Sequence, residues 1–148
     1  MLRSVLITNH VVAGAVIGAL VPRPSVAFGL GVVSHAAMDA WPHWGHPDHS
    51  VFLKVAVVDG LVGLTTMATL ARAAAPERRA AVVAGILGAC FPDADKPSTL
   101  FFGRSPFPAR VDDLHKRIQN EAHERMPYEA IGGLVGAFAT RALLRRLG

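Results

Sequence analysis

The sequence predicts an all-α protein: a compact bundle of about five apolar helices in up-down hairpins, with one amphipathic helix, embedded in a membrane. The chain has 148 residues, of which 51% are hydrophobic and 18% charged, whereas soluble domains usually contain about 25% charged residues. Its apolar runs are separated by proline-containing breaks, and most of the runs are too long for strands. The length fits a single domain over residues 1–148, and the single cysteine excludes a disulfide scaffold.

The order of the runs gives the order of the helices. We expect apolar helices at about 5–21, 26–41, 51–71, 80–92 and 127–144, and an amphipathic segment at about 105–125. Short connections between consecutive helices indicate antiparallel hairpins. Polar residues at the expected helix starts are candidate caps, with Thr8 or Asn9 for the first helix, Asp48 or Ser50 for the third, and Ser105 for the amphipathic helix.

Two environments remain open for this bundle, a lipid bilayer and water. A spanning helix needs about 20 apolar residues, a length that run 51–71 meets although it contains Lys54 and Asp59. Runs 2–21 and 128–144 come close, and the other two are short. Hydropathy favours the bilayer over a very apolar soluble bundle. A cleaved signal peptide is disfavoured because Asn9 and His10 interrupt the first run and no convincing cleavage site follows.

An up-down arrangement sorts the charged residues between the two ends of the bundle. One end receives His10, His35, His43, His46, His49, His115 and His123, with Asp39, Asp48, Asp93, Asp95, Asp112 and Asp113. The other receives Arg23, Arg72, Arg78, Arg79, Arg141, Arg145 and Arg146, with Glu77 as its acid. By the positive-inside rule the arginine-rich end is cytoplasmic and the His/Asp end faces outward, with Trp41 and Trp44 near its interface. A solvated face of a soluble bundle is the alternative.

The net charge of +4 raises the question of nucleic acid as a partner. The arginines are scattered over three regions of the chain and flank apolar runs, and the chain contains no recognition motif. We therefore expect no binding to nucleic acid.

Histidine and aspartate spacings suggest a site for a divalent metal ion. His35 and Asp39 are four residues apart, which places them on one helical face, one turn from each other. Asp93 and Asp95 follow the fourth run, two residues apart, in a turn that can bind a cation or simply end the helix. His10 is a polar group inside an apolar run, and there a satisfied core histidine is the alternative to a ligand.

Further groups complete this hypothesis. Asp59 lies within an apolar run, where an unpaired carboxylate costs several kcal/mol. His115 and His123 share a face of the amphipathic segment, with Gln119 between them, unless this is a solvated surface helix. We predict His10, His35, Asp39, Asp93 and His115 as metal ligands, and Asp59 or Asp95 as a general base or part of a second metal site. Nitrogen and oxygen ligands suit zinc first, with manganese or iron open, and Cys90 is expected in the core.

Three motifs together resemble a known family. They are Thr8-Asn9-His10, then Ser34-His35 through Asp39 to Pro42-His43-Trp44, then Pro92-Asp93-Ala94-Asp95. They are similar to small bacterial membrane-bound metal-dependent hydrolases, which are distantly similar to the all-helical zinc-dependent phospholipase C and P1-nuclease group. The resemblance covers most of residues 6–96. It implies a bacterial inner-membrane location, the lipid bilayer as a partner, and hydrolysis of a phosphoester.

Two functional hypotheses follow. In the first, the protein is a membrane-bound metal-dependent hydrolase acting on phosphoesters or lipid head groups. In the second, it is a non-enzymatic integral membrane protein in which the same cluster is a structural or binding site. A catalytic site keeps an open coordination position and a structural site is closed. Homo-oligomers are compatible with both hypotheses.

Overall fold

The computed structural model describes residues 6–147. Within that range the regular elements are helices joined by loops, and the extended pairing is one isolated bridge between His43 and Glu121. This confirms the all-α prediction. The elements in order are α1 (Ile7–Leu20), α2 (Pro24–Ala40), α3 (His49–Ala73), α4 (Pro76–Cys90), η1 (Phe91–Ala94), α5 (Asp95–Phe102), α6 (Ala109–Ile118), η2 (His123–Arg125) and α7 (Met126–Arg146).

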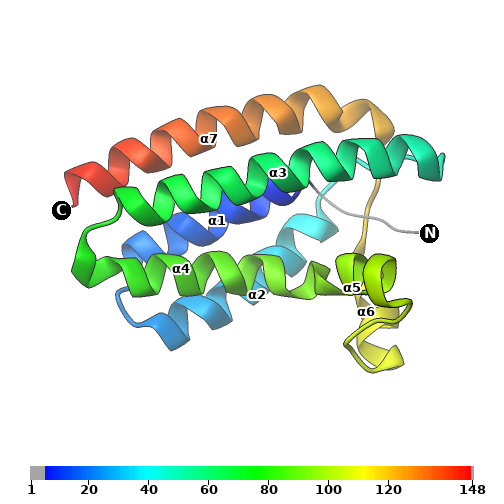
Figure 1. Cartoon of the computed structure of the whole chain (residues 1–148), viewed down its shortest axis with the longest axis horizontal. Helices are drawn as coiled ribbons and strands as arrows, with labels where there is room; N and C mark the ends of the chain where they lie inside the picture. The colour runs from blue at the N-terminus through cyan, green and yellow to red at the C-terminus, as the bar shows by residue number, and fades with distance from the viewer. Residues whose placement is uncertain (1–5, 148) are drawn as a thin grey trace.

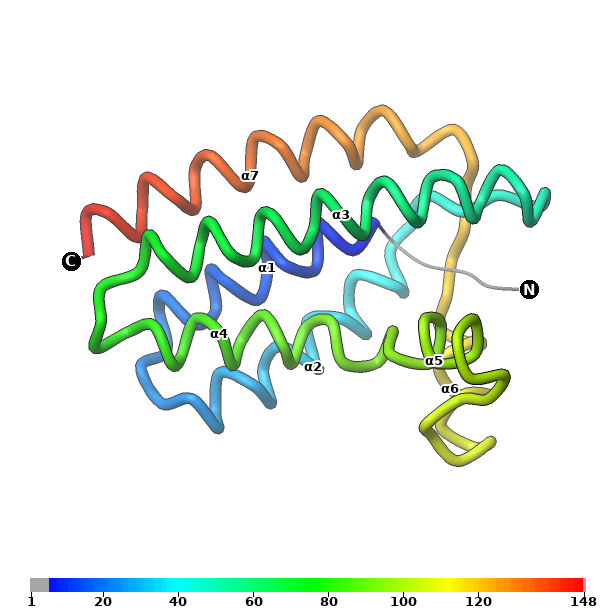
Figure 2. The backbone as a smooth tube through the Cα atoms, viewed as in Figure 1, coloured from blue at the N-terminus to red at the C-terminus, as the bar shows by residue number. Residues whose placement is uncertain are grey.

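The long helices alternate in direction, as the short loops predicted (Figure 1). The start of α1, the end of α2, the start of α3, the end of α4 and the start of α7 lie at one end of the bundle, together with α5 and α6 (Figure 2). The opposite helix ends lie at the other end of the bundle. The topology therefore places the histidines at one end and the seven arginines named above at the other. Arg104, Arg110, Arg117 and Arg125 lie at the histidine end, in or beside α5, α6 and η2.

Several boundaries and caps differ from the prediction. The fourth helix begins at Pro76 rather than near residue 80, because proline is well tolerated at the first helical position. The helix α5 was not predicted, and the helical part of the amphipathic segment is shorter than expected. The Asp48 cap is confirmed, since its carboxylate accepts hydrogen bonds from the Ser50 and Val51 N–H groups.

The other two cap predictions are wrong. The first helix begins at Ile7, so Thr8 and Asn9 lie inside it, and Leu6 occupies the cap position without a side-chain bond. Pro108 occupies the cap position of α6. The Ser105 hydroxyl instead accepts from the Phe107 N–H and donates to Asp112.

The centre of the fold is α4, whose backbone lies directly against α1 and α2. A Cβ added at Gly14 would come within 2.4 Å of the Gly85 carbonyl oxygen, and one at Gly88 within 2.1 Å of the Phe28 carbonyl oxygen. Only glycine allows the helices to approach this closely. The buried apolar core around this contact consists of Val11, Ala15, Ala19, Leu70, Ala74, Val82, Ile86 and Leu144, with Cys90 packed against it as expected.

The outer faces of α3 and α7 carry large apolar side chains that the described residues do not cover. Leu61 and Leu64 of α3 are 63% and 64% exposed, and Phe138 of α7 is 65% exposed. By length and composition one described helix, α3, is long and apolar enough to cross a membrane. Length and composition go no further than this, and membrane embedding of the bundle stays a prediction.

Candidate metal centre

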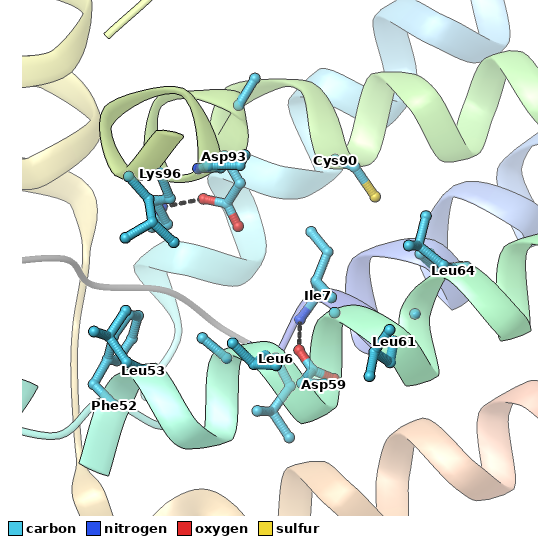
Figure 3. Close-up of a pocket in the computed structure, with 18 of the residues that line it drawn as sticks. Leu6, Ile7, Phe52, Leu53, Asp59, Leu61, Leu64, Cys90, Asp93 and Lys96 are labelled. Carbon is cyan, nitrogen blue, oxygen red and sulfur yellow. Dashed lines mark hydrogen bonds and ion pairs between the residues drawn. The ribbon is translucent and has the colours of Figure 1, made fainter. Parts of the chain in front are cut away.

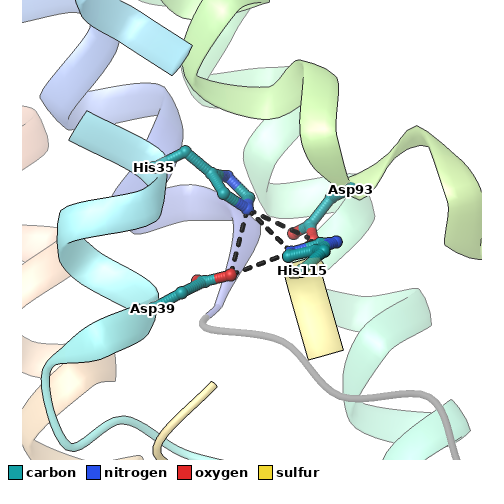
Figure 4. A group of neighbouring side chains, drawn as sticks. All are labelled: His35, Asp39, Asp93 and His115. Atoms are coloured by element: carbon teal, nitrogen blue, oxygen red, sulfur yellow. Dashed lines mark hydrogen bonds and ion pairs between the residues drawn. The ribbon is translucent and has the colours of Figure 1, made fainter. Parts of the chain in front are cut away.

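Three separate parts of the chain meet in one buried cluster. The helix α2 supplies His35 and Asp39, η1 supplies Asp93 at the end of α4, and α6 supplies His115 (Figure 4). One ligand atom from each of these side chains lies within 4.8 Å of the others. The four side chains are buried, with at most 7% of any residue exposed. His35 and Asp39, predicted to share one helical face, therefore belong to a larger group of side chains that can hold a metal ion.

The distances show that the four groups point at a common space. Asp39 Oδ2 lies 3.1 Å from His35 Nε2 and 2.9 Å from His115 Nε2. The two Nε2 atoms are 3.1 Å apart. Asp93 Oδ1 completes the group, 3.7 Å from His35 Nε2 and 3.5 Å from His115 Nε2. Two imidazole nitrogens and two carboxylate oxygens form a donor set typical of zinc, manganese or iron sites.

The backbone of α4 orients the His35 ring. His35 Nδ1 lies 2.7 Å from the Ala89 carbonyl oxygen, which can only accept a hydrogen bond. Nδ1 therefore carries a proton, and Nε2, which faces the cluster, would be the atom that binds a cation, as in metal-bound histidines with a carbonyl behind them. On the other side, the Gln119 side-chain amide donates to Asp39 Oδ2 over 3.3 Å.

His10 of α1 lies at the edge of this cluster. Its ring stacks on that of His35 with centroids 4.1 Å apart, and its Nε2 lies 3.5 Å from Asp39 Oδ1. The side chain is fully buried, and neither of its ring nitrogens nor Asp39 Oδ1 has a hydrogen-bond partner. Buried polar atoms without partners typically cost about 1–3 kcal/mol each. A cation between the two side chains would remove that cost, so the residues fit a bound metal ion.

The two carboxylates predicted as bases lie outside the group of four. Asp59 of α3 accepts hydrogen bonds from the Ile7 N–H, the Thr8 N–H at 3.4 Å and the Thr8 hydroxyl at 2.6 Å. Its carboxylate therefore caps the start of α1. Asp95 lies beside the cluster, with Oδ1 3.6 Å from Lys96 Nζ. A catalytic role for either carboxylate stays a prediction.

The sequence interpretation missed Lys96, although it is placed three residues after Asp93. Its ammonium group donates to Asp93 Oδ1. Burial alone would raise the pKa of Asp93, but the charges of Lys96, His10 and His35 hold that pKa below its ordinary value of 3.8. The carboxylate is therefore kept in the ionised form that a metal ligand requires.

Glu129 was also missed, and it ties three segments together at this end of the bundle. Its carboxylate accepts from the Leu6 N–H at 3.1 Å and from the Trp44 N–H. Trp44 is 3% exposed and stacks on Phe52, so its ring packs inside the protein, and its place near a membrane interface stays a prediction. Trp41, in contrast, is 70% exposed.

No protein-family model, curated protein or solved structure matches the chain. Fold and site alone therefore define its class, an all-helical protein with a buried His/Asp group able to hold a metal ion.

Proposed function

We propose that the protein is a membrane-bound, metal-dependent hydrolase of phosphoesters, with a zinc ion held by His35, Asp39, Asp93 and His115. The observation that carries the proposal is the convergence of these four buried donor atoms within 4.8 Å. His10 Nε2 and Asp39 Oδ1, which lie 3.5 Å apart without a hydrogen bond at the edge of the cluster, support a cation beside them. Zinc is favoured because it takes nitrogen and oxygen donors and can expand to five ligands, which would leave a position for water beside the four side chains. Manganese and iron are the other candidates.

The chemistry of the proposal follows from the ion and its neighbours. A divalent ion polarises a phosphoryl oxygen and lowers the pKa of water, which supplies a nucleophile at neutral pH. Lys96 is close enough to the cluster to bind a phosphate oxygen, because its ammonium group already contacts Asp93. Asp95 is the candidate general base, because its buried Oδ1 has no hydrogen-bond partner and lies 3.6 Å from Lys96 Nζ.

Surface character supports the membrane part of the proposal. The exposed apolar faces of α3 and α7 would be covered by lipid. The arginine-rich helix ends would lie on the cytoplasmic side of a bacterial inner membrane, and the metal cluster would face outward.

A non-catalytic metal site is the second candidate. Structural zinc sites are closed by four protein donors, whereas catalytic sites keep one position open. The four donors here would fill a tetrahedral ion, and each side chain is at most 8% exposed. In this alternative the ion would fasten η1 and α6 to α2 and would bring about no turnover.

Metal content of the purified full chain tests the site. We expect about one ion per chain in the wild type and loss of that ion in His35→Ala and Asp39→Ala. The matched control is His123→Ala, since this histidine is 74% exposed and lies outside the cluster. Circular dichroism of each variant, and the milder Asp39→Asn, separate loss of the ion from loss of the fold. Full metal content in both alanine variants would refute the assignment.

Turnover separates the two candidates. We expect the metal-loaded protein, in detergent, to cleave bis(4-nitrophenyl) phosphate, and we expect chelation to stop the reaction. Asp95→Asn should keep the ion and lose most of the activity. A full complement of metal with no cleavage of phosphodiesters or phosphomonoesters would favour the closed, non-catalytic site.

A further inference from the structure

A cavity of about 620 Å³ lies between α3 on one side and the start of α1, the end of α4, η1 and α5 on the other (Figure 3). This volume is within the range of about 300–1,000 Å³ that is common for ligand pockets. The lining is mostly apolar, and it includes Leu6, Trp44, Phe52, Leu64, Met67 and Cys90. A cavity with this lining offers few hydrogen bonds and suits a hydrocarbon chain.

The polar part of the lining is the edge of the metal cluster. Asp93, one of the four candidate ligands, and Lys96 both line the cavity. Lys96 is the cation among the described lining residues, and its side chain is 13% exposed. The third charged lining residue, Asp59, is occupied by the start of α1. A ligand in the cavity would therefore place an anionic group at Lys96 and the cluster.

The mouth of the cavity is apolar and exposed. Val57 and Leu61 of α3 and Phe101 of α5 line the cavity, and they are 58%, 63% and 75% exposed. This rim continues into the exposed face of α3. A hydrocarbon chain can therefore enter from a bilayer without crossing polar surface.

We propose that this cavity binds the hydrocarbon chain of a lipid phosphate and holds the phosphate at Lys96, next to the metal cluster. This inference rests on the proposed function, because it makes chain-bearing phosphoesters the substrate class of that site. Charge complementarity supports this occupant, since an ammonium group pairs with phosphate and the rest of the lining matches an alkyl chain. A water-soluble phosphoester would leave the apolar part of the cavity unfilled.

Two glycines give a matched pair of variants. Gly60 lines the cavity, and a Cβ added there meets nothing within 4 Å, so Gly60→Leu adds a side chain beside the cavity with no clash at its Cβ. Gly132 of α7 is also a helical glycine with nothing within 4 Å of an added Cβ, and it does not line the cavity. Gly132→Leu therefore controls for the change in helix propensity and in surface hydrophobicity.

Trp44 provides a fluorescent reporter in the wall of the cavity. The chain has two tryptophans, and of these Trp44 lines the cavity while Trp41 does not. In a Trp41→Phe background, a lipid with a brominated chain should quench Trp44 fluorescence when the chain occupies the cavity. The probe is lysophosphatidic acid with a dibromostearoyl chain, added to the metal-loaded full chain in detergent.

We expect saturable quenching that Gly60→Leu weakens at least ten-fold and Gly132→Leu leaves unchanged. Lys96→Met should weaken the phosphate lipid about ten-fold and leave the monoacylglycerol with the same chain unaffected. Competition by palmitoyl lysophosphatidic acid and by farnesyl phosphate distinguishes glycerolipid from isoprenoid sources of the chain.

Equal quenching in the Gly60→Leu and Gly132→Leu proteins, or quenching that never saturates, would overturn the inference. A dimer that Gly60→Leu converts to monomer would overturn it as well, by assigning the cavity to a second copy of the chain. Metal content measured on the same samples keeps the two proposals apart. Full metal content without binding of the lipid's hydrocarbon chain refutes the lipid site alone. Binding of the hydrocarbon chain with no metal in any preparation refutes the metal centre alone.

Discussion

Two halves of the bundle are built in opposite ways. In the half formed by α1, α2 and α4, glycines bring the backbones into contact, and the His/Asp cluster lies beside this contact. In the half formed by α3 and α7, large apolar side chains point outward, and α3 borders a cavity. The difference indicates that the two halves have different roles. The tight half holds the candidate ligands in fixed positions, and the open half offers apolar surface to a lipid or a bilayer.

The tight half owes its geometry to residues without side chains. Where small residues let two helices approach closely, van der Waals contact between their backbones holds the helices together, as is common in membrane proteins. The Ala89 carbonyl that orients His35 belongs to this close contact between α2 and α4. A shift of α4 would therefore also move the His35 ring.

The largest expected effect comes from adding one methyl group to this contact. Gly88→Ala would place a Cβ 2.1 Å from the Phe28 carbonyl oxygen, a backbone atom that cannot move by itself. We expect a loss of unfolding free energy of more than about 3 kcal/mol and a loss of bound metal. Chemical unfolding in detergent and metal analysis measure the two effects.

Gly132→Ala on α7 is the control for this prediction. An added Cβ there meets nothing within 4 Å, and alanine in a helix gains about 0.5–1 kcal/mol over glycine. A Gly88→Ala protein as stable as the Gly132→Ala protein would show that the α2 and α4 backbones are not in close contact at Gly88. That result would contradict the comparison of the two halves.

A smaller effect is expected from Asp59, the link between the two halves. Asp59→Ala removes the acceptor of the Ile7 and Thr8 N–H groups and of the Thr8 hydroxyl. Leaving such groups unpaired costs about 1–3 kcal/mol, and Asp59→Asn should cost less because it keeps one acceptor oxygen. If Asp59 acts only as this cap, metal content and turnover per folded molecule stay at wild-type values. Loss of turnover in a stably folded Asp59→Asn protein would instead establish the predicted catalytic role.

The sequence predicted the local features of this site well. His35 and Asp39 share a helix, so their spacing alone places them on one face. The up-down order of the helices follows from short loops and proline breaks, which predicted that Asp93 and His115 lie at the same end. Asp48 is confirmed as a cap. The sequence could predict this cap because capping depends only on the residue itself and the next three residues.

One wrong cap and two features that the sequence did not reveal depend on contacts between distant segments. Thr8 is a residue type that is common at helix caps. Asp59 of α3, however, accepts a hydrogen bond from the Thr8 hydroxyl at the start of α1, and the helix begins at Ile7. Trp44 is buried because it packs on Phe52, a contact that no single-chain pattern displays. The cavity beside Lys96 depends on the spacing of α3 from η1 and α5, and helix periodicity carries no information about that spacing.

The smallest effect is expected on the exposed face of α7. Phe138 is 65% exposed, so Phe138→Ser should change the unfolding free energy in detergent by no more than about 0.5 kcal/mol. Ile86 of the tight half is fully buried, and Ile86→Ala should cost about 2–5 kcal/mol under the same conditions. Because lipid would cover the face of Phe138, the serine variant should be easier to extract from membranes with alkaline carbonate. If Phe138→Ser proves as costly as Ile86→Ala, protein rather than lipid covers this face, and a homo-oligomer packed through α7 becomes the better account of the open half.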